Sequence, residues 1–350
     1  MAKKVAVIAG ASGVVGRGLT EALAVDPDWD VIALARKPTA IPGARFIPTD
    51  LTDAAECRDK LAGFVDTTHI FYTARFDHVA GKPEPIDTNL SMLRNVLEPI
   101  ETASKRLQHV HIVEGTKWYG SHLGPFRTPA REDDPRSVSA NFYYAQEDYL
   151  KERQRNAAWS WSSSRPHGIC HAVPDSPRNL VLVIAAYAVI CREMGLPLAF
   201  PGTAANYRAL YQCTSADQLV EAMLWMAREP ACANQAFNVT NGDYIRWENL
   251  WPAFARYFGM EAGGVATVQL ADAMADKAPV WQAIVSKNNL KPTPYDRLAL
   301  WSYGDFVFTP GWDIMSDTTK ARQFGFQRTV STEAEFIRYF DLLRASRVLP

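Results

Sequence analysis

Three glycines near the N-terminus constrain the fold more strongly than any other feature. Gly10, Gly13 and Gly16 have the spacing G-x-x-G-x-x-G, between an apolar, β-branched segment and an amphipathic helical pattern. Glycine permits a tight turn, and the missing Cβ lets a pyrophosphate approach the positive end of the following helix. This spacing also occurs in ordinary strand–helix turns, so by itself it is weak. Its position at the first strand of a βαβ series predicts a dinucleotide-binding turn.

Strand and helix patterns alternate along the first half of the chain. Strands are predicted at residues 30–36, 68–74, 108–115 and 159–169, and residues 44–53 predict a short strand with a turn into a helix. Helical patterns follow at residues 86–104 and 141–156. Such alternation implies a parallel sheet that is covered by helices on both faces. We therefore predict an α/β fold with a Rossmann-type, doubly wound parallel sheet.

The pattern loosens after residue 170, where proline and tryptophan become frequent. Helices are predicted around residues 178–194, 215–228, 246–259 and 331–346, with short strands between some of them. We predict an NADP-binding Rossmann domain over residues 1–170. Residues 171–350 should form a smaller C-terminal substrate-binding lobe, with some segments returning to the main sheet.

Composition narrows the classes of partner. The net charge is −1 and no block of basic residues occurs, which argues against nucleic acid and against an anionic membrane surface. The longest apolar run, residues 180–191, is too short for a bilayer span and predicts a buried helix. Five scattered cysteines without a CxxC pair, and a chain that opens directly into a strand, favour a cytoplasmic protein. The expected partner is a small molecule, and a homodimer is left open.

The second predicted strand ends in basic residues, Arg36 and Lys37. An NAD site usually has an acidic residue here for the ribose hydroxyls, whereas cations suit a 2′-phosphate, so we expect NADP(H). The alternative is a solvated basic turn. Asp50 and Leu51 are placed to flank the adenine. The predicted cofactor-binding residues are Gly10, Ser12, Gly13, Val14, Val15, Gly16, Arg36, Lys37, Asp50, Leu51, Tyr72, Thr73, Ala74, Tyr143 and Ile169.

Two short segments carry the predicted chemistry, "VEGTKWYG" at residues 113–120 and "NFYYAQED" at residues 141–148. Ordinary short-chain dehydrogenases have a serine in the first segment and a lysine four residues after a tyrosine in the second. Here Gly115 stands at the serine position, and Glu147 and Asp148 follow the two tyrosines. Lys117, in the loop after the fifth strand, could supply the missing cation because strand ends of a parallel sheet meet at one crevice. Equally, it could be a surface lysine beside a packed aromatic helix start.

Taken together, several motifs resemble the progesterone 5β-reductase/iridoid synthase-like family of extended short-chain dehydrogenases/reductases. They are "GASGVVG", "ALARK", "HIFYTA", "VEGTKWYG", "NFYYAQED", "WSSSRPHGI", "AFNVTNGDYIRWENLW" and "APVWQAIVSKNNL", and the resemblance extends from about residue 4 to the C-terminal "RVLP". It implies an NADPH-dependent reductase of enone C=C bonds, with Lys117 and Tyr143 as the catalytic pair and Ile169 beside the nicotinamide. Tyr144 would be a packing neighbour of Tyr143, although chemistry alone does not separate the two.

The substrate pocket is predicted from the same resemblance. The resemblance implies either a 3-oxo-Δ4-steroid 5β-reductase-like enzyme or a small-enone reductase. Arg75 stands where plant relatives have an aromatic residue, which argues against a bulky steroid and leaves a smaller or more polar enone open. The predicted wall residues are Arg75, Met92, Phe126, Trp301 and Tyr303. His167 and His171 have an i,i+4 spacing, but no carboxylate or cysteine set accompanies them, so no metal site is expected.

Three alternatives to an enone reductase remain open at this level. A carbonyl reductase or a sugar-nucleotide epimerase can use the same fold, although both normally need the Tyr-x-x-x-Lys pair that is absent here. A non-catalytic NADP-sensing protein would fit the loss of that pair, whereas retention of Lys117 and Tyr143 argues against it.

Overall fold

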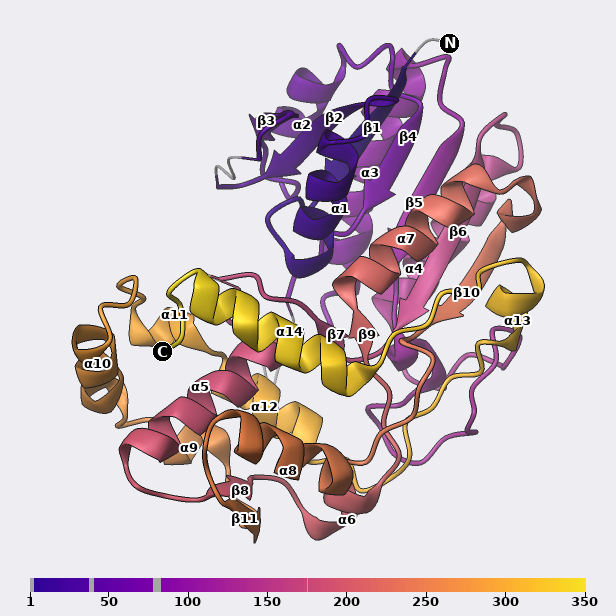
Figure 1. Cartoon of the computed structure of the whole chain (residues 1–350). Helices are drawn as coiled ribbons and strands as arrows, with labels where there is room; N and C mark the ends of the chain where they lie inside the picture. Colours follow the sequence, from indigo (N-terminus) through magenta and orange to yellow (C-terminus); the bar gives the residue numbers. More distant parts are fainter. Residues whose placement is uncertain (1–2, 38–40, 78–82, 175) are drawn as a thin grey trace.

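The computed structural model describes residues 3–37, 41–77, 83–174 and 176–350. Its centre is a seven-stranded sheet with the order β10-β6-β5-β4-β1-β2-β3, and all of its strand pairs are parallel (Figure 1). The strands are β1 (Lys4–Ala9), β2 (Trp29–Ala35), β3 (Ala44–Pro48), β4 (His69–Tyr72), β5 (His109–Val113), β6 (Ser160–Pro166) and β10 (Gln235–Val239). The predicted α/β fold with a doubly wound parallel sheet is confirmed.

Helices bury both faces of this sheet. α1 (Val14–Ala24) and α7 (Ala216–Arg228) pack on one face, and α2 (Ala54–Leu61), α3 (Ile86–Ala103) and α4 (Phe142–Gln154) pack on the other. Successive side chains of a strand point to opposite faces, so the neighbours Val7 and Ile8 lie in different core clusters. This two-sided burial explains why β1, β2 and β4 are mainly apolar.

A mainly helical lobe lies below the sheet in Figure 1. Its central helix is the apolar run of the sequence, buried from Leu180 to Cys191. The lobe elements are α5 (Leu180–Glu193), β8 (Leu198–Phe200), α6 (Ala204–Arg208), α8 (Trp247–Tyr257), β11 (Ala262–Val265), α9 (Leu270–Ala273), α10 (Ala278–Lys287), α11 (Tyr295–Leu298), α12 (Trp301–Phe308) and α14 (Thr332–Ala345). Strands β8 and β11 form a small parallel sheet of their own.

Several segments beyond residue 170 belong to the sheet rather than to this lobe. β10 is its edge strand, α7 covers one face, and α13 (Thr319–Gln323) packs beside β10. Among the short elements, β7 (Ile169–Cys170) pairs with β9 (Thr214–Ser215), the 3-10 turn η1 (Thr116–Tyr119) follows β5, and the turn η2 (Pro230–Cys232) lies between α7 and β10. The two parts are interleaved, and the division at residue 170 stays a prediction.

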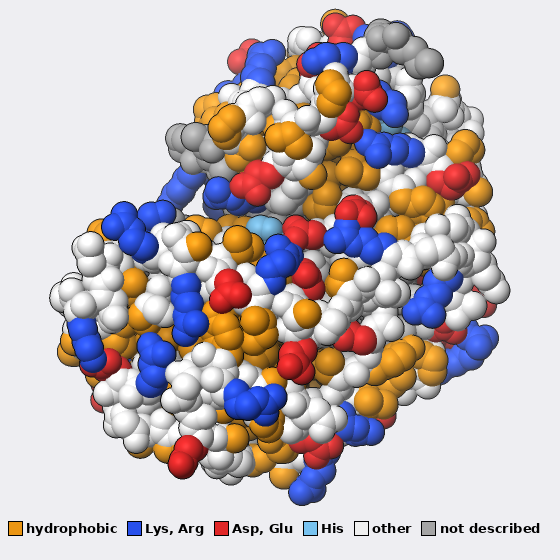
Figure 2. Space-filling model, in the orientation of Figure 1, with side chains coloured by type: hydrophobic (Ala, Val, Ile, Leu, Met, Phe, Trp, Pro, Cys, Tyr) orange, Lys and Arg blue, Asp and Glu red, His pale blue; other side chains and the backbone are white. Residues whose placement is uncertain are grey.

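The surface carries charges of both signs. Figure 2 shows Lys, Arg, Asp and Glu side chains mixed over the face drawn, in keeping with a net charge of −1. In the part of the chain that the structure describes, no helix has both the length and the apolar character needed to cross a bilayer.

A buried row of histidines and serines runs between β5 and β6. The His109 ring bonds to the hydroxyls of Ser160 and Ser162, both at 2.8 Å, and the His111 ring bonds to Ser162 and Ser164. Burial lowers the pKa of His109 to about 4, and it lowers the pKa of His111 well below the ordinary value. These rings are therefore neutral in the folded protein at neutral pH.

From the buried histidines we predict that the protein loses stability in mild acid. Burial also lowers the pKa values of His69 and His167 to about 3, so the unfolded chain binds more protons than the folded chain between about pH 4 and the ordinary histidine pKa of 6.5. The stability is fully present above pH 6.5 and falls with decreasing pH, by up to about 1.4 kcal/mol per pH unit for each histidine. Urea unfolding between pH 5 and pH 8 measures this slope.

A single substitution tests whether the buried row of histidines and serines causes the loss of stability in mild acid. In His111→Asn the amide can still bond to the serine hydroxyls, and the slope below pH 6.5 should shrink by up to about 1.4 kcal/mol per pH unit. An unchanged slope in this variant would mean that His111 contributes nothing to acid sensitivity.

Candidate active site

The glycine turn joins β1 to α1 at the point where the strand order of the sheet reverses. β1 lies between β4 and β2, so the carboxyl ends of β1 and β4 form the crevice at which such sheets bind ligands. Gly10 has φ +86°, and a Cβ there would come within 2.7 Å of the Ala74 backbone nitrogen. A Cβ on Gly16 would meet the Gly10 carbonyl oxygen at 2.3 Å. The backbone packing therefore requires glycine at both positions.

The turn also leaves hydrogen-bond donors for an anion. Gly13 caps α1 without a side-chain hydrogen bond, so the first backbone N–H groups of this 11-residue helix remain available. A cradle without Cβ atoms at the positive end of a helix fits a dinucleotide pyrophosphate. The side chains of Val15 and Tyr72 are buried in the core, so only their backbone groups are left to contact a cofactor.

Polar groups follow the ends of the neighbouring strands. Arg36 and Lys37 are exposed after β2, whereas Asp50 is partly buried after β3. Hydrogen bonds from the backbone and the hydroxyl of Thr52 lower the pKa of Asp50, with a smaller contribution from the charge of Arg36. Arg36 and Asp50 thus follow the carboxyl ends of the adjacent strands β2 and β3.

Tyr143 lies at the start of α4 with its ring directed into a cavity. Asn141 caps this helix, because its side-chain oxygen accepts the Tyr143 N–H at 3.0 Å, and its amide nitrogen donates to the Lys117 carbonyl at 3.0 Å. A single side chain thus joins the two predicted catalytic residues. A Cβ built on Gly115 would lie 3.4 Å from the Tyr143 hydroxyl, so the phenol occupies the space beside this glycine.

The structure distinguishes the two tyrosines that chemistry alone does not separate. The Tyr144 hydroxyl donates to the Trp118 carbonyl and accepts the Ser137 N–H at 2.9 Å. By contrast, the Tyr143 side chain lines the cavity, and its hydroxyl has no hydrogen-bond partner among the described residues. Burial raises the pKa of Tyr143, although the positive charge of Arg75 opposes this shift. Tyr143 is thus a protonated donor with free bonding capacity.

Lys117 lies in η1 and lines the same cavity. Its Nζ atom is 3.6 Å from a carboxylate oxygen of Glu84, and its side chain is 16% exposed. Burial lowers the pKa of Lys117, and the positive charge of Arg75 acts in the same direction. The amine is therefore held inside the site rather than in bulk water.

A buried guanidinium links the elements that carry Lys117 and Tyr143. Arg165 of β6 donates to Glu114 at 2.9 Å and to Glu147 of α4 at 2.9 Å. The same group stacks on the Trp118 ring of η1 at 3.6 Å and donates to the Tyr119 hydroxyl at 3.2 Å. Glu147 stands where ordinary short-chain enzymes have lysine. It thus pairs with a buried structural cation and does not line the cavity.

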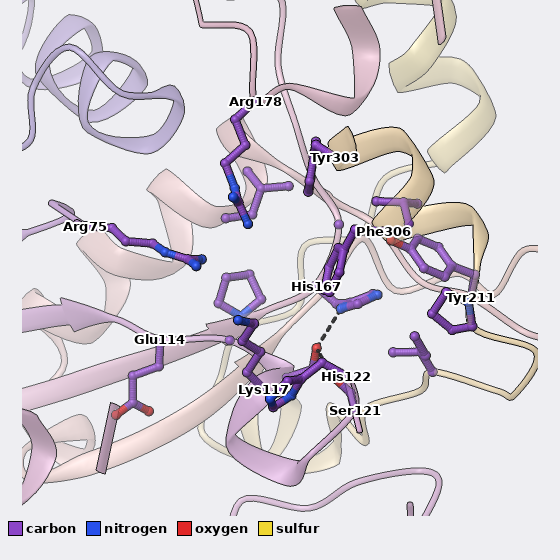
Figure 3. A pocket seen from close by; sticks show the side chains of 18 of the residues that line it. Arg75, Glu114, Lys117, Ser121, His122, His167, Arg178, Tyr211, Tyr303 and Phe306 are labelled. Atoms are coloured by element: carbon purple, nitrogen blue, oxygen red, sulfur yellow. Dashed lines mark hydrogen bonds between the residues drawn. The ribbon is translucent and has the colours of Figure 1, made fainter. Parts of the chain in front are cut away.

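The cavity has a volume of about 210 Å³ and lies between the carboxyl end of the sheet and the helical lobe. Figure 3 shows Lys117 and His122 on one side, Arg75 on another, and Arg178, Tyr303 and Phe306 entering from the lobe. The predicted residues that line it are Val14, Arg75, Lys117, Tyr143, Ile169 and Tyr303.

Three predicted wall residues do not line this cavity. Met92 is buried in the core between the sheet and α3, and Trp301 is buried in the core of the lobe. Phe126 packs against the lobe core and against the aromatic cluster of Trp118 and Phe142. The sequence pattern does not distinguish an apolar side chain in a pocket wall from one in the core.

Other cavity residues were not predicted. They are Glu114, Thr116, Ser121, His122, Arg178, Tyr211, Phe306, Val307, Pro310 and Ile314, among others. Arg178 directly precedes Asn179, whose side chain caps α5, so the cap residue before the apolar run could have marked its position. Its direction into the cavity depends on how the lobe packs on the sheet, which local sequence does not reveal.

The two histidines with i,i+4 spacing lie in different surroundings. The His167 ring bonds to the Thr116 hydroxyl at 2.6 Å and packs on Tyr211, whereas the His171 Nε2 atom lies 3.7 Å from Asp217. Among the described residues, no group of three or more His, Cys, Asp or Glu side chains could hold a metal ion.

Comparison with known sequences gives close relatives over the full length. A family model described as a PRISE-like Rossmann-fold domain matches residues 6–350. The chain is 34% identical to an (S)-8-oxocitronellyl enol synthase of Nepeta racemosa over 369 aligned residues, which cover 99% of this chain and 94% of the relative. It is 33% identical to a 3-oxo-Δ4,5-steroid 5β-reductase of Arabidopsis thaliana, with the same coverage.

Solved structures share the fold at much lower identity. A UDP-glucose 4-epimerase superposes with a TM-score of 0.72 at 14% identity, covering 99% of both chains. The enzyme of the same name from Thermus thermophilus, solved with NAD, gives a TM-score of 0.67 at 16% identity, covering 98% of this chain and 99% of that one. These similarities concern the fold alone.

The position of Glu147 against Arg165 predicts the effect of restoring the ordinary lysine. In Glu147→Lys a second cation would be buried against Arg165, and the carboxylate that pairs with Arg165 would be lost. The free energy of unfolding should therefore fall by at least about 3 kcal/mol. The matched control is Asp148→Lys, because Asp148 is 58% exposed and pairs with Arg136 at the surface. The control should lose less than about 1 kcal/mol. Equal losses for the two variants in urea unfolding would contradict the structural role of Glu147.

Proposed function

Because this chain belongs to the PRISE-like Rossmann-fold family, we propose that it is an NADPH-dependent enone reductase. The family predicted from its motifs is confirmed by the full-length match. The proposed reaction reduces the C=C bond of an α,β-unsaturated carbonyl compound. It is supported by one observation above all, that the Tyr143 hydroxyl has no hydrogen-bond partner among the described residues and Tyr143 lines a cavity that Lys117 also lines.

The residues around the glycine turn fit a nicotinamide dinucleotide. The cradle formed by Gly10, Gly13 and Gly16 would take the pyrophosphate, and Arg36 and Lys37 would take a 2′-phosphate. Ile169 lies at the cavity, where it would pack beside the nicotinamide. When bound, NADPH would supply the hydride that goes to the β-carbon of the substrate.

Tyr143 and Lys117 would act on the substrate oxygen. As hydride reaches the β-carbon, negative charge moves to the carbonyl oxygen, and a hydrogen bond from the Tyr143 hydroxyl stabilises the enolate. Burial raises the pKa of Tyr143, so the phenol keeps its proton and serves as a donor. Lys117 supports this charge electrostatically from η1. Solvent supplies the proton to the α-carbon, which completes the saturated ketone.

The position of the substrate carbonyl determines which carbon atom is reduced. With the carbonyl oxygen held at Tyr143, the β-carbon must be the atom that is presented for reduction.

The cavity volume of about 210 Å³ lies below the ~300–1,000 Å³ common for drug-sized ligands, which favours a small enone over a steroid.

The alternative reactions are less well supported. Carbonyl reduction and sugar-nucleotide epimerisation normally use lysine four residues after the tyrosine, whereas Glu147 bonds to Arg165 here. A non-catalytic NADP sensor would not need a cavity-lining tyrosine whose hydroxyl has no hydrogen-bond partner in the described part of the chain. The direct test is NADPH oxidation with 2-cyclohexen-1-one, progesterone and an iridoid dialdehyde, followed by product identification. Products reduced only at C=O would reject the proposal.

The catalytic pair gives a mutational prediction. Tyr143→Phe should lower kcat with 2-cyclohexen-1-one about 100-fold, because one preorganised donor to the developing oxyanion is lost. Lys117→Ala should lower kcat about tenfold or more, whereas the Kd for NADPH, from fluorescence titration, should change much less in both variants. Tyr144→Phe is the matched control and should keep kcat within a few-fold. Equal rates for Tyr143→Phe and wild type would remove this hydroxyl from the mechanism.

The basic turn after β2 gives a prediction on cofactor preference. Arg36→Ala should raise the KM for NADPH about tenfold or more, because a charged hydrogen bond to the 2′-phosphate contributes about 1.5–3 kcal/mol. The KM for NADH should change little. Lys105→Ala, which removes an exposed charge after α3, controls for net charge. If both cofactors lost affinity equally, Arg36 would not recognise the 2′-phosphate.

A further inference from the structure

The cavity has more cations than its catalytic chemistry requires. Arg75, Lys117 and Arg178 all line it, whereas its lining carboxylate, Glu114, is bonded to the buried Arg165. Lys117 has Glu84 at 3.6 Å. Two guanidinium groups, those of Arg75 and Arg178, therefore remain to be explained.

These two arginines are poorly neutralised. Among the described residues, their acidic partner is Asp77, which lies 3.7 Å from Arg75 Nε and 3.5 Å from Arg178 Nη1. Asp77 is 63% exposed, so solvent screens both contacts. Both arginines line the same cavity as Tyr143.

Arg75 holds buried donors without acceptors. Its Nε and Nη2 atoms are buried and have no hydrogen-bond partner in the described part of the chain. A buried donor without a partner is destabilising, and a bound acceptor removes that cost. An anion bound between Arg75 and Arg178 would supply acceptors to this incompletely partnered guanidinium group.

Aromatic rings hold the two guanidinium groups in place. Arg75 lies over the Phe142 ring at 5.6 Å, and Arg178 lies over the Tyr303 ring at 4.9 Å. Figure 3 shows the two groups entering the cavity from different sides, Arg75 from the sheet and Arg178 from the lobe. Stacked, planar guanidinium groups lose little freedom when they bind a carboxylate through two parallel hydrogen bonds.

We infer that Arg75 and Arg178 form a carboxylate-binding subsite, so that the natural substrate is an enone that carries a carboxylate. This inference rests on the proposed enone reductase activity. Tyr143 binds the carbonyl oxygen at one end of the substrate, and the two arginines bind the carboxylate at the other. The cofactor phosphates have separate partners, namely the glycine turn and Arg36.

Matched substrates test the subsite. They are the enones CH₃–CO–CH=CH–(CH₂)n–CO₂⁻, with two to four methylene groups, and their uncharged methyl esters. For wild type, kcat/KM for the best acid should exceed that for its ester about 10- to 100-fold, as expected for charged hydrogen bonds. Equal values for acid and ester would overturn the subsite.

Variants of the two arginines test whether these residues cause the preference for the acid over the ester. Arg75→Met and Arg178→Met should each reduce the acid-to-ester ratio about tenfold, mainly through KM of the acid. Arg94→Met is the matched control, because Arg94 is exposed on α3 and stacks on Tyr149 outside the cavity. It should leave the ratio unchanged. If the Arg75 and Arg178 variants raised the KM for NADPH rather than that for the acid, the arginines would belong to the cofactor site and the inference would be rejected.

A binding measurement separates this inference from the proposed activity. The saturated keto acid and its methyl ester are titrated calorimetrically into the protein with NADP⁺ present. Tighter binding of the acid to wild type, lost in Arg75→Met, supports the subsite even if no enone is reduced. Absence of C=C reduction for 2-cyclohexen-1-one, for every ester and for every acid would instead reject the proposed activity. Equal binding of acid and ester rejects the subsite alone.

Discussion

The active-site arrangement depends on the buried guanidinium of Arg165. This group reaches from β6 to Glu114 at the end of β5, to Glu147 on α4 and to the Trp118 ring in η1. A charge that is 2% exposed is tolerated only when it is fully paired, so these partners must stay where they are. As a result, the helix that carries Tyr143 and the turn that carries Lys117 are fixed relative to one another.

This constraint explains the missing lysine of ordinary short-chain enzymes. The position four residues after Tyr143 faces Arg165, so a glutamate is needed there for pairing. Lys117 lines the cavity from η1 instead, and Asn141 bonds its backbone carbonyl to the start of α4. In the proposed mechanism the tyrosine stays protonated and donates to an enolate, a role for which a raised pKa is suitable. The phenol needs no adjacent lysine to make it a stronger acid.

The sequence predicted the parts of the molecule that depend on local geometry. The glycine turn, the parallel strands and the buried helix at Leu180–Glu193 follow from spacing and apolar pattern. The glycines are required because backbone atoms at Gly10, Gly16 and Ala74 approach too closely for a Cβ. Contacts between distant segments were not predictable in this way. Arg178 enters the cavity only because the lobe packs over the sheet, and Met92 lies in the core although its type suits a pocket wall equally well.

The position of isotope in the product tests the central claim most directly. The protein reduces 2-cyclohexen-1-one in ordinary water with NADPH that carries deuterium at the transferable C4 position, and the product is analysed by NMR. If Tyr143 holds the carbonyl oxygen as an enolate forms, deuterium appears at the β-carbon of cyclohexanone, hydrogen from water appears at the α-carbon, and the carbonyl is intact. Deuterium on the carbonyl carbon of an allylic alcohol would contradict this account.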